Sequence, residues 1–517
     1  MAMATGVLGM LLLVACEVPD VPKSVPASWP AWLGDCQRPE DLALVGLYAE
    51  GRCGQLAVAE DPRQPDGRMI DLAVMVLPAI ARMAAPDPVF FLAGGPGQSA
   101  IETGPGVFQM LPKLRRQRDI VLVDQRGTGA SNSLACGTTD PQDDFRLSAR
   151  EQAALQVARL QTCLPTLNAA PALYTTAMAV QDLEAVRQAL GYTQINLFGI
   201  SYGTRVALVY LREFPQRVRA LLLDGVAPPD ISIVAEFVQT GDAALDRLFA
   251  DCQAVAACAQ AFPDLAPHFG ATLQRLVAAP QLWPMRHPGT GVLTDSWVDA
   301  QLVTGIVRQV LYQRTLSTLL PLALEQAWGG DYQTLLTLGY QFSAGADSIS
   351  LGMMASVFCA EDMAQAVLLG GADGGAGTAP GKYFSPSMTA QMAEICQFWP
   401  AALPPVGAFA AVSSAAPVLL ISGELDPVTP PAFAERALST LTNARHVVVA
   451  GVGHNAAFSG CVPRLLSEFI EDLAPQALDL ACLENIQRPP FFTSNAGPGR
   501  LIRPVGSVLP TAGQDDD

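Results

Sequence analysis

The chain has 517 residues and a formal net charge of −17, and half of its residues are hydrophobic while only 15% are charged. This length is typical of two or three folding units, or of one large domain with an insertion. The apolar content excludes general disorder. The 31 basic residues are outnumbered by 48 acidic ones and form no cluster in the sequence. This excludes nucleic acid and an anionic membrane surface as expected partners.

The first residues have the pattern of an export signal. Gly6 to Ala15 is an apolar run too short to span a bilayer, and it ends in Leu13-Val14-Ala15-Cys16, which resembles a bacterial lipobox. We therefore expect a signal peptide over residues 1–15, lipidation of Cys16 and a Pro- and Ser-rich tether over residues 16–35. No Lys or Arg precedes the run, so an ordinary secretory signal or a buried helix remains an alternative.

Ten further cysteines favour an oxidising compartment because their number is even. No Cys/His spacing fits a zinc site, so neither a metal nor another cofactor is expected. The count leaves many pairings open, and reduced thiols in a cytosolic enzyme are the alternative. Each cysteine has a near neighbour, and pairing in chain order predicts Cys36–Cys53, Cys136–Cys163, Cys252–Cys258, Cys359–Cys396 and Cys461–Cys482. Together with the leader, this predicts an exported, membrane-anchored protein, periplasmic or on the cell surface.

The chain then alternates short apolar runs with amphipathic stretches, which indicates a mainly parallel sheet covered by helices on both faces. The predicted elements of this first part are strands at Val89–Leu92, Ile120–Val123, Ile195–Phe198 and Ala220–Leu223, and helices at Gln181–Leu190 and Val206–Phe214.

From about Asp230 to Leu403 the alternation stops and the sequence is mostly helical. Strands resume at Val418–Ile421 and His446–Val449, followed by a helix from Arg464 to Leu473. An interrupted and then completed sheet is typical of a lidded α/β enzyme. The expected units are a core at 36–229, a helical cap at 230–405, a second core part at 406–486 and a loose tail at 487–517.

A serine stands where a strand passes into a helix, in Gly199-Ile200-Ser201-Tyr202-Gly203. Small glycines allow the tight turn that exposes a nucleophilic hydroxyl. The motif alone is weak, and its position between an apolar strand and an amphipathic helix makes Ser201 the predicted nucleophile.

Of four histidines, His454 is the expected general base, because it follows a strand in a glycine turn. His268 and His287 lie in the insert, and His446 begins a strand. Asp426, just after the strand at Val418–Ile421, is the expected orienting acid, with Glu424 as its rival.

The expected oxyanion hole consists of two backbone N–H groups. Tyr202, which follows the nucleophile, supplies one, and Gly95, in the glycine loop after the strand at Val89–Leu92, supplies the other.

Five motifs follow one another in the chain: Gly94-Gly95-Pro96-Gly97, Asp124-Gln125-Arg126-Gly127-Thr128-Gly129, Gly199–Thr204, Asp426-Pro427-Val428-Thr429-Pro430 and Gly453-His454. In this order they resemble the prolyl iminopeptidase and tripeptidyl aminopeptidase branch of the α/β-hydrolases, from about Cys36 to Cys482. Ala93 departs from the histidine of the small cytosolic members and is similar to the larger secreted type. The resemblance implies the α/β-hydrolase fold with a large helical cap before the acid-bearing strand. It further implies an acidic residue of the insert, Glu361, that holds the substrate amine. A solvated carboxylate beside a disulfide is the alternative interpretation of Glu361.

The leading hypothesis is an exported serine peptidase that acts at peptide N-termini, tripeptidyl- or prolyl-aminopeptidase-like, through a Ser–Asp–His triad and an acyl-enzyme. Its expected partners are peptide substrates, and it contacts a membrane only through the lipid anchor. A carboxylesterase with the same triad is the alternative, since fold does not determine substrate. A non-catalytic lipoprotein is the third hypothesis. The oligomeric state is left open.

Overall fold

The structure is a computed structural model that describes residues 29–37, 45–137, 146–343, 349–370 and 379–499. The predicted signal peptide, the lipidation site Cys16 and most of the predicted tether lie outside these residues.

The centre of the fold is a nine-stranded sheet in the order β1-β2-β3-β5-β4-β6-β7-β10-β11. The six strands from β5 to β11 in this order run parallel to one another. The other three, β1, β2 and β3, are antiparallel to their neighbours and lie at one side of the sheet. Their bounds are β1 Leu33–Asp35, β2 Arg52–Ala59, β3 Met69–Leu77, β4 Val89–Leu92, β5 Ile120–Val123, β6 Ile195–Ile200, β7 Val218–Asp224, β10 Val418–Gly423 and β11 Ala444–Val449.

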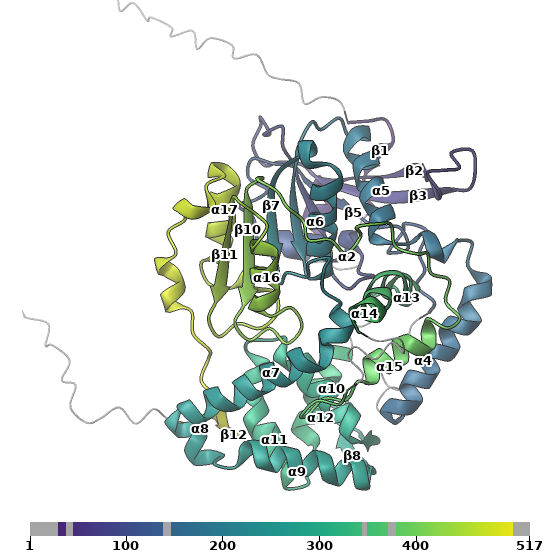
Figure 1. Cartoon of the computed structure of the whole chain (residues 1–517). Coiled ribbons are helices and arrows are strands. Elements are labelled where there is room, and N and C mark those ends of the chain that lie inside the picture. Colours follow the sequence, from purple (N-terminus) through teal and green to yellow (C-terminus); the bar gives the residue numbers. More distant parts are fainter. Residues whose placement is uncertain (1–28, 38–44, 138–145, 344–348, 371–378, 500–517) are drawn as a thin grey trace, which may run out of the picture.

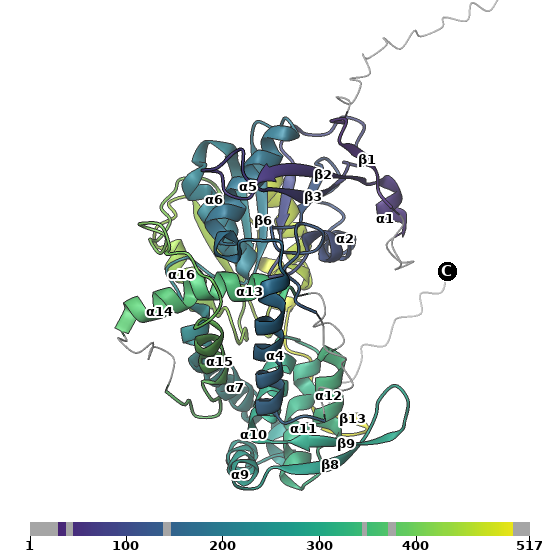
Figure 2. The ribbon, with the colours of Figure 1, turned by 90° about the vertical axis from the view of Figure 1, so that its right-hand side faces the viewer.

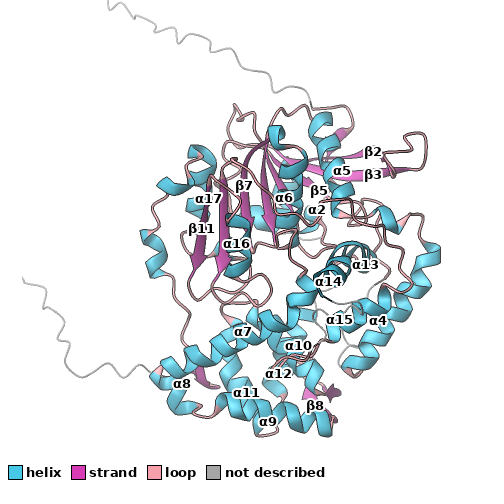
Figure 3. Ribbon diagram, in the orientation of Figure 1, coloured by secondary structure: helices cyan, strands magenta, loops and turns pink. Residues whose placement is uncertain are grey.

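Helices cover both faces of the sheet, as Figures 1 and 3 show. Alternate residues of β4 take part in two different cores. Phe90 belongs to the core that also includes residues of α5 (Thr176–Ala189), α6 (Tyr202–Glu213) and α16 (Pro431–Leu438). Phe91 belongs to the core on the other face, which includes residues of α2 (Ala100–Met110) and α17 (Val462–Asp472). Strands buried on both faces need continuous apolar runs, which is why β4, β5 and β10 consist almost entirely of aliphatic and aromatic residues. The predicted α/β class is confirmed.

A helical layer, here called the lid, is inserted between β7 and β10 and has a hydrophobic core of its own. Figure 2 shows the lid below the sheet, with α4 (Ala149–Cys163) standing beside it. Its elements are α7 Ile233–Ala254, α8 Ala256–Ala261, α9 Leu265–Ala278, β8 Gln281–Arg286, β9 Leu293–Val298, α10 Ala300–Leu311, α11 Leu320–Trp328, α12 Gln333–Ser343, α13 Leu351–Val357, a π-helical turn Phe358–Asp362, α14 Met363–Gly370 and α15 Ser387–Ile395.

The apolar stretch Leu351–Leu368, which comprises α13, the π-helical turn and most of α14, is long enough to cross a membrane by length and composition. About two thirds of it (67%) is buried inside the protein, so this stretch is a core helix of the lid.

Two segments expected to be loose are ordered. Leu33–Asp35, at the end of the expected tether, pairs with β2 as an edge strand. The expected tail at 487–517 is packed as far as it is described, because Phe491 is buried in the lid core and Arg488 pairs with Asp251 at 3.1 Å. The hairpin of β12 (Phe492–Ser494) and β13 (Gly497–Pro498) follows. The burial of Phe491 and the ion pair of Arg488 therefore contradict the loose tail that composition predicts from residue 487 onward.

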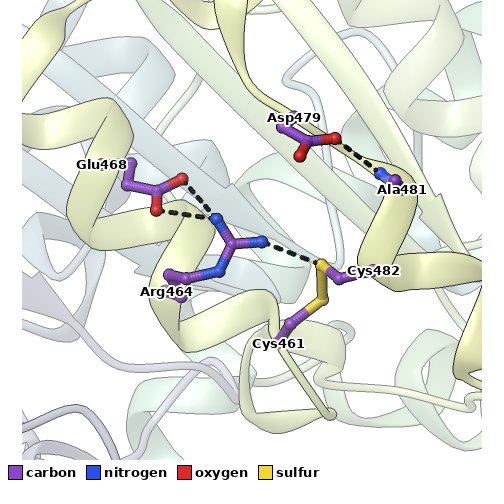
Figure 4. Close-up of a disulfide and its surroundings, with 6 residues drawn as sticks. All are labelled: Cys461, Arg464, Glu468, Asp479, Ala481 and Cys482. Atoms are coloured by element: carbon purple, nitrogen blue, oxygen red, sulfur yellow. Dashed lines mark hydrogen bonds and ion pairs between the residues drawn. A yellow bond between two sulfur atoms is a disulfide. The ribbon is translucent and has the colours of Figure 1, made fainter.

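Five disulfides join the described cysteines, in the chain-order pairs expected from the sequence. The last of them connects Cys461, at the start of α17, to Cys482, in the 3₁₀ turn Ala481–Asn485. Figure 4 shows Arg464 between this bond and Glu468: its guanidinium lies 2.7 Å from the carboxylate and 3.1 Å from Cys482 Sγ. The bond thus fixes the segment that directly follows the His454 loop.

Candidate active site

Ser201 lies in a sharp turn at the carboxyl end of β6. Its φ of 57° and ψ of −124° are a strained combination for a residue with a side chain. The turn also brings α6 very close to the sheet, since a Cβ on Gly203 would lie 2.1 Å from the carbonyl oxygen of Leu92. A Cβ on Gly199 would lie 2.4 Å from the carbonyl oxygen of Gly203. Only glycine fits at both positions, which explains the motif around the half-buried Ser201.

His454 and Asp426 form a buried pair in the loops after β11 and β10. The Nδ1 of His454 lies 2.7 Å from Asp426 Oδ2, and their residues are only 9% and 3% exposed. The other oxygen of Asp426 accepts the N–H groups of Val428 and Thr429 at 2.9 Å, and the Thr429 hydroxyl donates to Oδ2 at 2.8 Å. With Nδ1 facing the carboxylate, Nε2 is the nitrogen available for a proton from another group.

The charges of this pair reinforce each other. Burial alone would lower the pKa of His454, but the charge and hydrogen bond of Asp426, with a smaller effect of Asp224, raise that pKa above its usual value. Burial would raise the pKa of Asp426, but His454 and the hydrogen bonds to the carboxylate hold that pKa below its usual range. The pair therefore favours a negative carboxylate beside an imidazole that readily becomes positive.

The rival acid Glu424 has other partners. Its carboxylate lies 2.6 Å from Arg247 and accepts the Gly451 N–H at 3.0 Å. Glu424 thus supports the loop before His454, while Asp426 contacts the imidazole itself.

Ser201 and His454 both border the end of β7. The Ser201 N–H donates to the carbonyl of Asp224 at 2.9 Å, and a Cβ on the next residue, Gly225, would lie 2.9 Å from His454 Cε1. Within the described part of the chain, no hydrogen bond joins the Ser201 hydroxyl to the imidazole. The three side chains are thus brought to neighbouring strand ends, with the hydroxyl unbound.

The loop after β4 lies against Ser201. A Cβ on Gly94 would come within 3.2 Å of Ser201 Cβ, and Gly95 has a φ of 105°, which glycine adopts without strain. Tyr202 begins α6, so its N–H is one of the first-turn groups that have no acceptor within the helix. The segments that carry Gly95 and Tyr202 thus both adjoin Ser201.

Asp124, at the end of β5, anchors this loop. Its carboxylate accepts the Ser99 hydroxyl at 2.6 Å and the Ile101 N–H at 3.0 Å. Its neighbour Arg126 is fully buried and binds Asp182 through two nitrogens, at 2.6 and 2.7 Å. The Asp-Gln-Arg-Gly-Thr-Gly motif thus has a structural role in shaping the loop beside Ser201.

No sequence pattern indicated a role for Tyr312, a lid residue just after α10. Its ring packs edge-on against the His454 imidazole, with centroids 5.1 Å apart. The backbone of the same turn lies against the base loop, since a Cβ on Gly453 would approach the carbonyl oxygens of Leu311 and Tyr312 to 2.5 and 2.6 Å. The lid therefore contacts His454 directly.

Glu361 lies in the π-helical turn and has partners within the protein. Its two carboxylate oxygens accept the N–H and the hydroxyl of Thr176 at 2.7 and 2.8 Å, and Arg205 lies 3.7 Å away. The Thr176 hydroxyl also contacts the hydroxyl of Tyr202 at 2.8 Å. The expected amine anchor is thus connected to the side chain of Tyr202.

Glu361 also borders a cavity of about 430 Å³ lined by Thr176, Arg205, Val209, Leu403 and Phe409 among others. Ser201, Asp426 and His454 do not line this cavity. In the part of the chain that the structure describes, no three His, Cys, Asp or Glu side chains are grouped to hold a metal ion.

Comparison with known proteins agrees with this geometry. The family model described as "alpha/beta hydrolase fold" matches residues 87–460, which is well over half of the chain. The chain belongs to the α/β-hydrolase fold family.

Three curated relatives are similar over part of their length. The serine protease Hip1 of Mycobacterium tuberculosis is 36% identical over 222 residues, 40% of this chain and 42% of that protein. The tripeptidyl aminopeptidase of Streptomyces lividans is 29% identical over 193 residues, 34% of this chain and 36% of that protein. Carboxylesterase B of M. tuberculosis is 28% identical over 266 residues, 47% of this chain and 49% of that protein.

The chain thus spans less than half the length of the curated relatives it matches. The peptidase resemblance expected from the five motifs is confirmed.

Proposed function

We propose that the protein is an exported serine hydrolase that cleaves peptides near their N-termini, with Ser201 as nucleophile, His454 as general base and Asp426 as orienting acid. The observation that carries the proposal is the buried 2.7 Å pair of His454 and Asp426 beside the strained Ser201 turn. The similarity to a serine protease and to a tripeptidyl aminopeptidase supports a peptide substrate.

The proposed mechanism assigns one role to each of these groups. His454 Nε2 takes the proton of the Ser201 hydroxyl as its oxygen attacks the scissile carbonyl carbon. The resulting oxyanion accepts the N–H groups of Gly95 and Tyr202. The imidazolium, stabilised by Asp426, then protonates the leaving amine, and an acyl-enzyme remains on Ser201. His454 next deprotonates a water molecule, which hydrolyses the ester and restores the serine.

The lid supports action at a chain end. Tyr312 and the end of α10 cover His454 from the lid side, as the ring contact and the close approach to Gly453 show. A substrate that reaches Ser201 must therefore pass beneath or beside a helical layer, which a peptide terminus does more easily than the middle of a folded chain. We accordingly propose that residues 230–405 act as a cap.

Export is supported by the cysteines. Five disulfides account for all ten described cysteines, and such bonds persist in oxidising compartments. The leader and Cys16 support attachment to a membrane through a lipid, so we propose a periplasmic or cell-surface lipoprotein.

A carboxylesterase is the second candidate, and the contacts of Glu361 favour it. Both carboxylate oxygens of Glu361, the expected amine anchor, already accept hydrogen bonds from Thr176, and the carboxylate faces Arg205. The similarity to carboxylesterase B points in the same direction.

The test compares substrates and nucleophile variants. Fluorophosphonate labelling should require Ser201 and be lost in Ser201→Ala, while Ser467→Ala, a half-buried serine of α17, should label normally. Peptide anilides with a free amine should be cleaved much faster than their N-acetylated forms. Equal rates, or faster cleavage of simple esters, would favour the esterase, and labelling that survives Ser201→Ala would refute the triad.

A further inference from the structure

Asp224, the last residue of β7, contacts the segments of both Ser201 and His454. Its main-chain carbonyl accepts the Ser201 N–H at 2.9 Å. Its two carboxylate oxygens accept the N–H groups of Ala456 and Ala457, each at 2.9 Å, directly after the His454 turn. One residue therefore fixes the turn of the nucleophile and the loop of the base.

The carboxylate of Asp224 is an unusual group for this place. The residue is 0% exposed, and within the described residues no basic side chain forms an ion pair with it. A buried carboxylate without a cation is unfavourable, and its burial raises the pKa of Asp224 to about 6 despite the two N–H donors. An asparagine has only one side-chain oxygen, so it could accept one of these two N–H groups, and its NH₂ group would face the other donor. The site thus selects a carboxylate.

The same carboxylate contributes to the charge around His454. Asp426 faces the imidazole from the loop after β10, and Asp224 acts on it from β7. Tyr312 faces it from the lid, and burial raises the pKa of that phenol, so Tyr312 stays neutral. The imidazole therefore has two anions and no cation among these neighbours, an arrangement that stabilises the imidazolium formed when it takes a proton from Ser201.

We infer that Asp224 is a second acidic positioning residue of the triad: it holds the His454 loop at a fixed place relative to Ser201 and stabilises the protonated base. This inference rests on the proposed function, because it assumes that Ser201 and His454 react. Asp224 does not touch the substrate, so its effect is expected in kcat and in the pH profile, with little change in KM.

The experiment measures kcat, KM and the pH profile of kcat/KM for Asp224→Asn, Asp224→Glu and a control. Asp119→Asn is the matched control, since Asp119 is also a buried aspartate whose oxygens accept an N–H and a hydroxyl, from Ala79 and Tyr192 at 2.8 Å. Folding of each variant is checked by circular dichroism.

For Asp224→Asn we expect kcat to fall about tenfold, since the variant leaves one of the Ala456 and Ala457 N–H groups without an acceptor and removes an anion beside the imidazole. The acid limb of the profile should move to lower pH, because losing a nearby anion lowers the pKa of His454. Asp224→Glu keeps the charge but displaces the loop, so its kcat should fall while its acid limb stays near that of the wild type. Asp119→Asn should keep both the kcat and the profile of the wild type.

An Asp224→Asn enzyme with an unmoved acid limb and unchanged kcat would overturn the inference. If that variant does not fold, Asp224→Glu decides, and a wild-type kcat in it would refute the positioning role. Failure of the proposed function is recognised separately, because wild-type protein would then not react with a fluorophosphonate at Ser201.

Discussion

Replacing Asp426 by asparagine tests the acid–base pair most directly. In the wild type, Asp426 Oδ1 accepts two backbone N–H groups at 2.9 Å, and Oδ2 faces His454 Nδ1 at 2.7 Å. An asparagine satisfies the two N–H groups only with its single oxygen, so its NH₂ must point at the imidazole. Nδ1 then has to accept, the proton moves to Nε2, and Nε2 can no longer take the proton of Ser201.

The expected magnitude follows from this change of tautomer. We expect kcat to fall about 10⁴-fold, the effect of the same exchange in other serine triads, with little change in KM. In the wild type the acid limb of kcat/KM should lie above about pH 6.5, because the pKa of His454 is raised and the neutral imidazole is the active form. Activity should therefore be lost as the pH falls through that raised pKa.

The assay is steady-state hydrolysis of a peptide anilide from pH 5 to 9, combined with the rate of fluorophosphonate labelling. Glu424→Gln is the control, because this carboxylate lies only two residues away but pairs with Arg247. An Asp426→Asn enzyme within tenfold of wild-type kcat, or a Glu424→Gln enzyme with the larger loss, would refute the assignment of the acid.

Three further predictions concern the surroundings of the site. Thr429→Val removes a hydroxyl that donates to Asp426 at 2.8 Å, and kcat should fall about tenfold in the same assay. Glu361→Gln should lower kcat for free-amine peptides and for esters alike, because the carboxylate holds Thr176, which contacts Tyr202; a loss confined to free-amine peptides would restore Glu361 as amine anchor. Replacing Cys461 and Cys482 by serine opens a loop of 21 residues and should lower the free energy of unfolding by about 3 kcal/mol in urea titrations, and an unchanged midpoint would contradict this.

Local patterns predicted the nucleophile turn and the parallel strands well, because their causes lie within a few residues. The Gly-x-Ser-x-Gly turn needs small residues at its own positions, and β4 and β10 are buried on both faces and hence continuously apolar. The strand β2 was missed, since its half-exposed pattern with Cys53 and Gly54 lacks a clear alternation. The strand β8 lies in the insert that is predicted from the sequence to be mostly helical, and its largely exposed side chains give no strand pattern.

Contacts between distant segments could not be predicted from sequence. Thr176 and Glu361 are 185 positions apart, and Asp224 and Ala456 are 232 apart. The periodicity of the sequence does not predict such pairs, because they form only when the sheet is assembled and the lid packs against it. The family resemblance indicated a role for Glu361, but only the folded structure shows that its carboxylate binds Thr176.

The position of the lid in the chain also determines when the site can exist during synthesis. The ribosome completes the Ser201 turn and β7 before any residue of the lid, whereas β10 with Asp426 and β11 with His454 follow the lid. β10 must then pair with β7 across the whole intervening lid, a non-local step of the kind that slows folding. A nascent chain that has passed Ser201 but has not reached His454 thus carries the serine turn alone, and the proposed catalytic site can be completed only after the lid has been made.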